Sequence, residues 1–204
     1  MKFFIAIMLS ALSMLAHAED RLEEMLNAKV ASLRVELLNE AGPYQRVAVV
    51  EELVQAMSMH DVDVRVSQKP IPGGAIYYPG VILIGADLAD LPRAQMAFIL
   101  AHEYGHHVRR HWKATLSRGV GLALAAGVTV KVAEDLDPFV DAAVTPETKH
   151  RDEYEADASA VVLLKHAKLY DVAAIDKLMQ RIGADESVTH PSGADRVKAM
   201  KAHQ

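Results

Sequence analysis

The sequence predicts an α+β fold that is mostly helical and carries a small β-sheet. Apolar residues recur at helical spacing over long stretches, whereas strict alternation and short continuous apolar runs occur between residues 61 and 84. The predicted helices cover residues 19–40, 44–59, 92–112, 151–167 and 170–182, and a short one follows from residue 192. The chain has 204 residues, of which 51% are hydrophobic and 24% charged, so we expect one domain over residues 19–204.

Residues 1–18 have the pattern of a secretory signal peptide. Lys2 is followed by an apolar stretch over residues 3–15 and by a small-x-small cleavage site (AHA) at 16–18. The stretch is short for a membrane span, which favours cleavage and a periplasmic location over an uncleaved anchor. No cysteine follows it, so a lipoprotein anchor is excluded and no disulfide is needed. A net charge of −5 gives no electrostatic footprint for nucleic acid, which is not an expected partner.

Three short strands are expected between the second and third predicted helices. Residues 61–67 alternate strictly, residues 75–78 lie between Pro- and Gly-rich turns, and residues 81–84 (VILI) form the strongest continuous run. The last strand directly precedes the helix predicted at 92–112. Its free edge can pair with an extended substrate, and an ordinary strand with a covered edge is the alternative.

The predicted helix 92–112 contains an HExxH pattern, HEYGH at residues 102–106. A proline at its start and basic residues near its end suit a helix of this length. Positions four apart share one helical face, so His102 and His106 can bind one zinc ion while Glu103 reaches a water on it. A chance motif and a structural zinc site are the alternatives. Structural sites normally use four Cys or His ligands, and this chain has no cysteine.

A third ligand is expected from the helix predicted at 151–167. Hydrolytic zinc sites use three protein ligands and a water, and Glu153, Glu155 and Asp157 are the candidates. Glu153 and Asp157 share one face, whereas Glu155 points roughly opposite. We therefore take Glu153 as the ligand and Asp157 as the acceptor for the free N–H of a ligand histidine. The alternative for all three acids is a solvated helix start.

Two segments near these helices admit more than one interpretation. The apolar run 119–130 is too short to cross a bilayer, which favours a buried helix; peripheral membrane contact through residues 119–131 is the alternative. Residues 134–150 hold two prolines and several acids. They are expected to form an exposed loop with one short helical piece near the entrance of the site.

Three motifs in order resemble those of a known family. HEYGHHVRRH at 102–111, an ExxAD pattern at 153–157 and a late HP-x4-R stretch at 190–196 are similar to the gluzincin metallopeptidases that include HtpX and the CAAX prenyl proteases. The matching segments run from about Val81 to Arg196. The chain has none of the membrane spans of HtpX, so it resembles the soluble exported branch.

The resemblance implies a zincin-like metallopeptidase domain whose small sheet lies beside the HExxH helix. It implies one Zn²⁺ per chain, bound by His102, His106 and Glu153. Glu103 is then the general base, which accepts a proton from the zinc-activated water, and Asp157 orients a ligand.

The resemblance also implies that His190 and Arg196 lie near the zinc as catalytic residues. His190 is then a cap or a transition-state group, and Arg196 ties down its loop or stabilises the oxyanion. The expected activity is that of a periplasmic zinc endopeptidase that cleaves unfolded or extended polypeptides in quality control, with envelope proteins as further partners. A zinc-binding chaperone or adaptor held inactive by the His190 loop is one alternative, and an interaction module with a chance motif is another. The remaining histidines, including His111, are expected to be structural or exposed.

Overall fold

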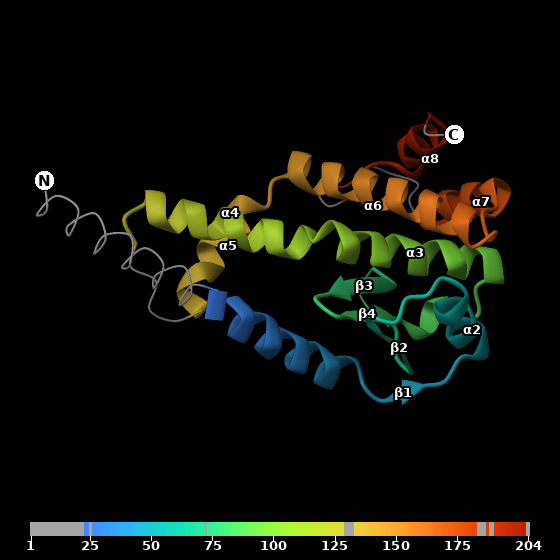
Figure 1. Ribbon diagram of the computed structural model, residues 1–204, viewed down its shortest axis with the longest axis horizontal. Coiled ribbons are helices and arrows are strands. Elements are labelled where there is room, and N and C mark those ends of the chain that lie inside the picture. The colour runs from blue at the N-terminus through green and yellow to red at the C-terminus, as the bar shows by residue number, and fades with distance from the viewer. Residues whose placement is uncertain are drawn as a thin grey trace, which may run out of the picture.

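Two long helices form the frame of the molecule. The computed structural model describes residues 23–24, 26–71, 73–128, 133–182, 187 and 190–202; the predicted signal peptide lies outside this part. Helices α3 (Arg93–Arg109) and α6 (Pro146–His166) lie side by side, and a four-stranded sheet lies on the other side of α3 (Figure 1). The prediction of a mostly helical α+β fold with a small sheet beside the HExxH helix is confirmed.

The sheet is mixed and has the strand order β1-β2-β4-β3. Strands β2 (Asp63–Ser67) and β4 (Val81–Ile84) pair in parallel; β3 (Ala75–Tyr78) pairs with β4, and β1 (Tyr44–Gln45) with β2, both antiparallel. β4 is central and fully buried, as its continuous apolar sequence explains. The prediction that residues 81–84 have a free edge is therefore wrong, and the alternative of a strand with covered edges holds. The edge beside α3 belongs to β3, which pairs on one side only in the described part of the chain.

The other helices pack around this frame. They are a helix over residues 26–41, α2 (Ala48–Ala56), α4 (His111–Ala125), α5 (Asp137–Ala143), α7 (Val172–Ile182) and α8 (Gly193–Ala202), with 3-10 turns η1 (Ala86–Leu88) and η2 (Ala133–Leu136). In Figure 1, α4 runs on from α3 toward one end of the molecule, where α5 packs against it, while α7 and α8 lie at the opposite end.

The segment 134–150 is largely helical and not the exposed loop expected from its composition. Pro138 and Pro146 each lie in the first turn of a helix, where the missing N–H is tolerated. Val140 of α5 packs so closely on α4 that a Cβ added at Gly119 would lie 2.7 Å from its Cγ2. The two prolines therefore start helices, and α5 is held in place by contact with α4.

The predicted helix 92–112 divides at Arg110. This residue adopts the left-handed conformation, with φ 55° and ψ 38°, so α3 ends at Arg109 and α4 begins at His111. A non-glycine residue seldom takes this conformation, which is why no sequence signal marked the boundary. The break changes the helical phase between the two segments.

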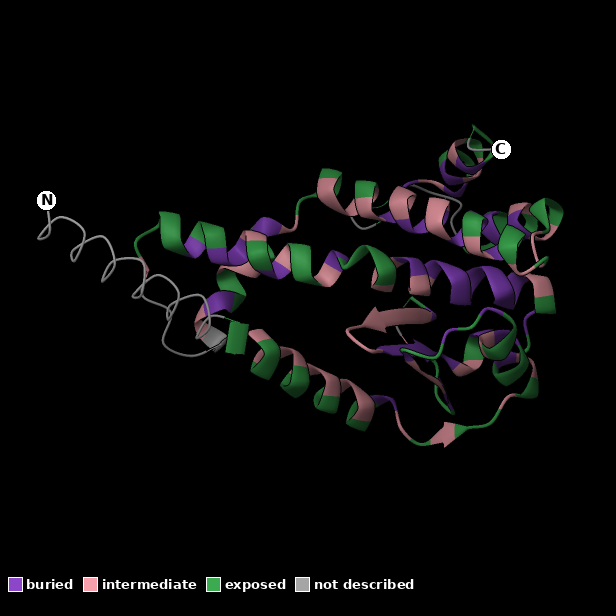
Figure 2. Ribbon diagram, in the orientation of Figure 1, coloured by how far each residue is buried: buried purple, intermediate pink, exposed green. Residues whose placement is uncertain are grey.

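The core surrounds α3, which is buried along the part that crosses the sheet (Figure 2). Phe98 and Leu100 belong to a cluster that also contains Ile82 of β4 and Leu164 of α6. On the α6 side, small residues allow a very close approach, because a Cβ at Gly105 would lie 2.6 Å from the carbonyl oxygen of Ala156. This contact fixes the position of α6 relative to the HExxH residues.

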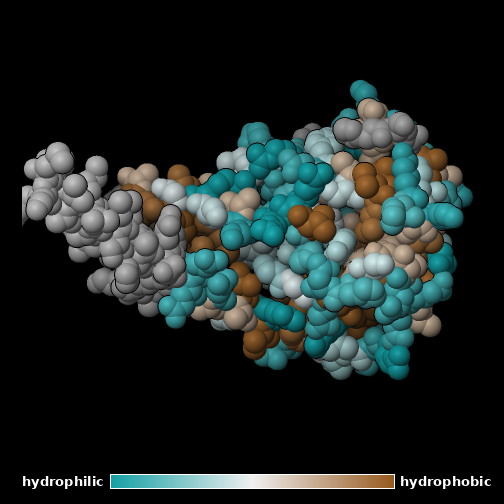
Figure 3. All heavy atoms as spheres, in the orientation of Figure 1, coloured by the Kyte–Doolittle hydropathy of each residue, from teal (hydrophilic) through white to brown (hydrophobic). Residues whose placement is uncertain are grey.

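The apolar run from residue 119 forms the second half of α4. It is neither the fully buried helix that we favoured nor a fully exposed apolar surface. Val120 and Ala123 are buried, while Leu122 and Leu124 are 43% and 65% exposed. Hydrophobic side chains reach the surface near the α4–α5 end of the face shown in Figure 3. Within the described residues, no helix has the length and apolar character that crossing a bilayer requires. Membrane contact through residues 119–131 stays a prediction, and 129–131 lie outside the described part.

Candidate metal centre

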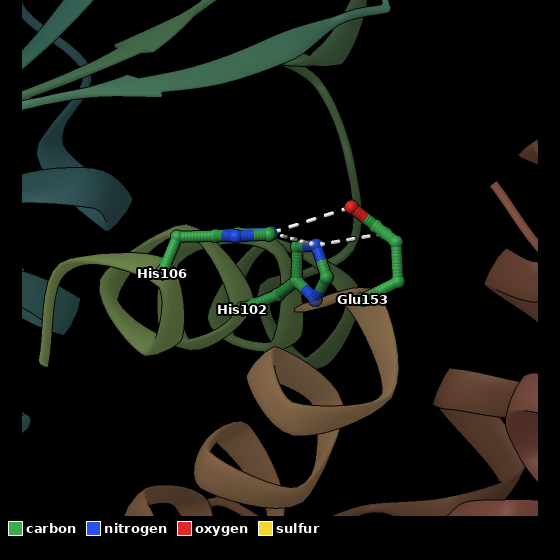
Figure 4. Close-up of side chains that lie close together, drawn as sticks. All are labelled: His102, His106 and Glu153. Carbon is green, nitrogen blue, oxygen red and sulfur yellow. Dashed lines mark hydrogen bonds and ion pairs between the residues drawn. The ribbon is translucent and has the colours of Figure 1, made fainter. Parts of the chain in front are cut away.

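Three side chains from two helices converge at the centre of the molecule. His102 and His106 lie one turn apart on α3, and Glu153 faces them from α6 (Figure 4). The two Nε2 atoms are 3.2 Å apart. Glu153 Oε2 lies 3.4 Å from His102 Nε2, and Glu153 Oε1 lies 3.4 Å from His106 Nε2. The sequence prediction that these three residues meet is confirmed.

The arrangement fits a tetrahedral divalent cation. Bond lengths of about 2.0–2.2 Å around a tetrahedral zinc place neighbouring ligand atoms roughly 3.3 Å apart, close to the three separations found here. One ligand atom from each of the three residues lies within 4.8 Å of the others. Glu153 Oε2 is buried and has no hydrogen-bond partner in the described part of the chain. The Glu153 carboxylate thus directs one oxygen toward each imidazole Nε2, and two imidazoles with one carboxylate are a donor set that zinc binds.

The imidazole of His102 is held from behind by Asp157. His102 Nδ1 lies 2.9 Å from Asp157 Oδ1, so its N–H donates to that carboxylate and Nε2 is left free to bind a cation. Arg196 of α8 donates to both oxygens of Asp157, over 2.8 Å from Nε and 2.7 Å from Nη2. Its Nη1 also lies 3.3 Å from Glu153 Oε2. The guanidinium of Arg196 thus contacts the two buried carboxylates, and the expected role of Arg196 in holding the loop of residue 190 stays a prediction.

These contacts decide the charge states inside the site. Burial alone raises the pKa of the Asp157 carboxyl, but hydrogen bonds and charge from Arg196 outweigh it, and the pKa falls below its ordinary value. For Glu153, burial again opposes ionisation, and contact with His102, His106 and Arg196 lowers the pKa well below its usual range. Burial also disfavours a charged His102, yet Glu153 and Asp157 raise its pKa to about 10 when no cation is bound. Both carboxylates are thus ionised, and a bound metal displaces a proton from His102.

Glu103 and His190 lie beside the three ligands. Both line a cavity of about 970 Å³, and His102, His106 and Glu153 line the same cavity. His190 Nε2 is 3.8 Å from Glu153 Oε1, and its side chain is 53% exposed, so it lies at the mouth of the site and outside the three-residue group. The backbone N–H of His190 donates to Ser187 Oγ.

A family model described as Peptidase family M48 matches residues 40–204. The chain belongs to this family. Membership implies a metallopeptidase, a class of hydrolase, as the motifs indicated. A search of curated proteins found no match.

The M48 site opens onto a cleft between β3 and the helices. Gly73, Ala75 and Tyr77 line the cavity on the sheet side, opposite the metal-binding group. Lys29 and Leu33, from the helix of residues 26–41, also contribute to its walls. Trp112, Leu116, Leu136, Val140 and Val144 give the α4–α5 end of the cavity an apolar surface. A cleft with a partly apolar wall and a strand edge on one side can accept an extended polypeptide.

The structure also places two residues behind His106, and the sequence analysis assigned neither of them this position. His111 Nδ1 lies 2.8 Å from His106 Nδ1, and His111 Nε2 lies 3.3 Å from Glu155 Oε2. We had expected His111 to be structural or exposed and Glu155 to point away from Glu153 and Asp157. The phase change at Arg110 returns His111 to the site, and no periodicity in the sequence reveals it.

Proposed function

We propose that this protein is a zinc-dependent endopeptidase of the bacterial cell envelope. The observation that carries the proposal is the convergence of His102, His106 and Glu153 within a cavity that also contains Glu103. Two histidines and a glutamate leave one position of a tetrahedral zinc open, which is the pattern of catalytic sites. Membership in family M48 supports the same chemistry.

Each residue of the site has a separate role in the proposed hydrolysis. When bound to the three ligands, zinc supplies an activated water and polarises the substrate carbonyl. Glu103 accepts the proton from the attacking water and later passes it to the leaving amine. Asp157 holds His102 in the tautomer that presents Nε2 to the metal. His190, at the mouth of the site, is positioned to donate to the developing oxyanion, and Arg196 sets the charge of the carboxylates.

Unfolded or extended polypeptides are the proposed substrates. β3 offers a strand edge to a peptide backbone, and the cavity of the metal-binding group is lined both by Val140 of α5 and by Met179 of α7, which belong to opposite ends of the molecule (Figure 1). A cleft of this kind accepts the middle of a chain, which favours internal cleavage. The N-terminal pattern of residues 1–18 supports export to the periplasm, where proteolysis of damaged envelope proteins is the proposed role. Leu122 and Leu124 support peripheral membrane contact through 119–131.

The decisive experiment compares the wild type with Glu103→Gln. Both proteins should contain one zinc per chain by metal analysis, because Glu103 is not a ligand. The variant should lose casein hydrolysis by at least about 100-fold. A Glu52→Gln variant, altered on the exposed α2, serves as the control and should keep full activity. Turnover retained in the zinc-loaded Glu103→Gln protein would reject the general-base role, and absence of zinc from the wild type would reject the proposal altogether.

A chaperone or adaptor on the same scaffold is the second candidate. The position of His190 favours it, because Nε2 is 3.8 Å from a ligand oxygen and a small shift of the loop would bring it to the metal. In that case His190→Ala should raise peptidase activity, since the open position is no longer covered. A fall in activity would instead support the role of His190 in the transition state.

A further inference from the structure

His111 and Glu155 form a supporting chain behind the second metal-binding histidine. His111 is 8% exposed and lies at the first position of α4, with its ring 4.9 Å from that of His106 in an edge-to-face arrangement. Glu155 also belongs to α6, where it lies in sequence between the ligand Glu153 and the supporting residue Asp157. Nothing in the HExxH pattern assigns a role to either residue.

The direction of the hydrogen bonds follows from the metal-binding geometry. His106 directs Nε2 toward His102 and Glu153, so that nitrogen must be unprotonated to bind a cation. The proton of the neutral ring is then on Nδ1. Because His106 Nδ1–H faces His111 Nδ1 over 2.8 Å, His111 must accept at that atom. The proton of His111 is therefore on Nε2, which faces Glu155 Oε2 over 3.3 Å.

The geometry points to His111 as a positioning residue that orients His106 for zinc, with Glu155 fixing the tautomer of His111. This inference rests on the proposed zinc-dependent function. It completes a symmetry in the site, because each ligand histidine then has a carboxylate behind it: Asp157 directly behind His102, and Glu155 behind His106 through His111. Arg151 Nε lies 3.7 Å from Glu155 Oε1 and adds a positive charge at the outer end.

The left-handed residue Arg110 makes this contact available. On an uninterrupted helix, a residue five positions after His106 would point about 140° away from it. The φ of 55° at Arg110 re-phases the chain so that the first residue of α4 faces back toward the site. The break between α3 and α4 thus has a direct consequence for the metal-binding group.

The experiment measures zinc affinity of the full-length protein by competition with a chromophoric chelator. His111→Leu keeps an apolar side chain of similar size and removes the acceptor, and should weaken zinc binding by about 10- to 100-fold. His111→Asn retains an acceptor oxygen near the place of Nδ1 and should stay within about threefold of the wild type. His166→Leu, at an exposed histidine of α6, is the matched control and should leave the affinity unchanged.

A spectroscopic measurement on the zinc-loaded wild type gives an independent answer if His111→Leu does not fold. Imidazole nitrogen chemical shifts should identify His111 as the Nε2–H tautomer, and the His106 Nδ1–H should exchange slowly with solvent. An Nδ1–H tautomer at His111 would overturn the inference. So would wild-type zinc affinity in a folded His111→Leu protein, or an equal loss in the Leu and Asn variants. A wild type that binds no zinc would instead refute the proposed function.

Discussion

Gly105 and Ala156 bring the two metal-binding helices into backbone contact. A Cβ added at Gly105 would lie 2.6 Å from the carbonyl oxygen and 2.9 Å from the Cα of Ala156. Backbone atoms cannot rotate away as a flexible side chain can, so this contact sets the separation of α3 and α6. Glu153 lies almost one turn before Ala156 on the same helix, and its reach to the histidines depends on that separation.

Substitution of Gly105 by alanine should therefore separate the helices. We expect Gly105→Ala to lower the free energy of unfolding by about 1–3 kcal/mol and to weaken zinc binding, because Glu153 is drawn away from the histidines. Thermal unfolding and a zinc titration would measure the two effects. Gly121→Ala is the matched control: it lies on α4 with nothing within 4 Å of the added Cβ. It should be neutral or stabilise the protein by up to about 1 kcal/mol.

Removal of the Arg196 guanidinium should take two charged hydrogen bonds from the buried carboxylate of Asp157, which then keeps only its contact with His102 among the contacts described above. We expect Arg196→Gln to lose about 3–5 kcal/mol of stability in denaturant unfolding. Lys201→Gln provides the comparison on the same helix, because its ion pair with Asp176 is half exposed and worth about 0–1 kcal/mol. Similar losses in the two variants would show that the buried contacts of Arg196 contribute little.

The raised pKa of His102 predicts a pH dependence that zinc abolishes. When zinc is removed by a chelator, protonated His102 stabilises the folded state fully below its ordinary pKa of 6.5, and this contribution is lost as the pH rises toward about 10. The melting temperature of the chelated protein should therefore fall between about pH 6.5 and 9, whereas the zinc-loaded protein lacks this decline. Chelated His102→Ala should also lack it. An equal decline in that variant would assign the effect to other groups.

Backbone pairing of a substrate with β3 predicts a sensitivity that alternates along the peptide. In a ladder, only every second residue directs its N–H toward the neighbouring strand. N-methylation of a peptide substrate should therefore raise KM by about 2- to 10-fold at alternate positions and have little effect between them. The measurement is KM for a series of singly methylated peptides. Uniform sensitivity along the peptide would argue against strand pairing.

The sequence predicted those parts of the site that depend on helical periodicity. Four-residue spacing placed His102 and His106 on one face, and the same spacing separated Glu153 and Asp157 from the rest of their helix. These relationships lie within single helices, so they can be predicted without knowledge of the tertiary structure. The strands were found for a similar reason, because alternation and apolar runs are local signals.

Features that depend on tertiary contacts were not predictable in the same way. The pairing of β4 on both sides placed the strand edge on β3, and strand order is not encoded in the period of either strand. The left-handed Arg110 returned His111 to the site, and α5 formed where prolines suggested a loop. In each case a long-range contact, between strands, with α4 or with the HExxH residues, decided what the local pattern left open.

The ligands of the proposed metal belong to two packed helices, while much of the cleft wall comes from β3, α4, α5 and the helix of residues 26–41. The metal-binding residues and much of the cleft wall therefore belong to different elements. On the proposed function, exchange of a wall residue such as Val144 should change which peptides are cut and leave zinc binding intact. Engineering of new cleavage preferences should begin at those walls and leave α3 and α6 untouched.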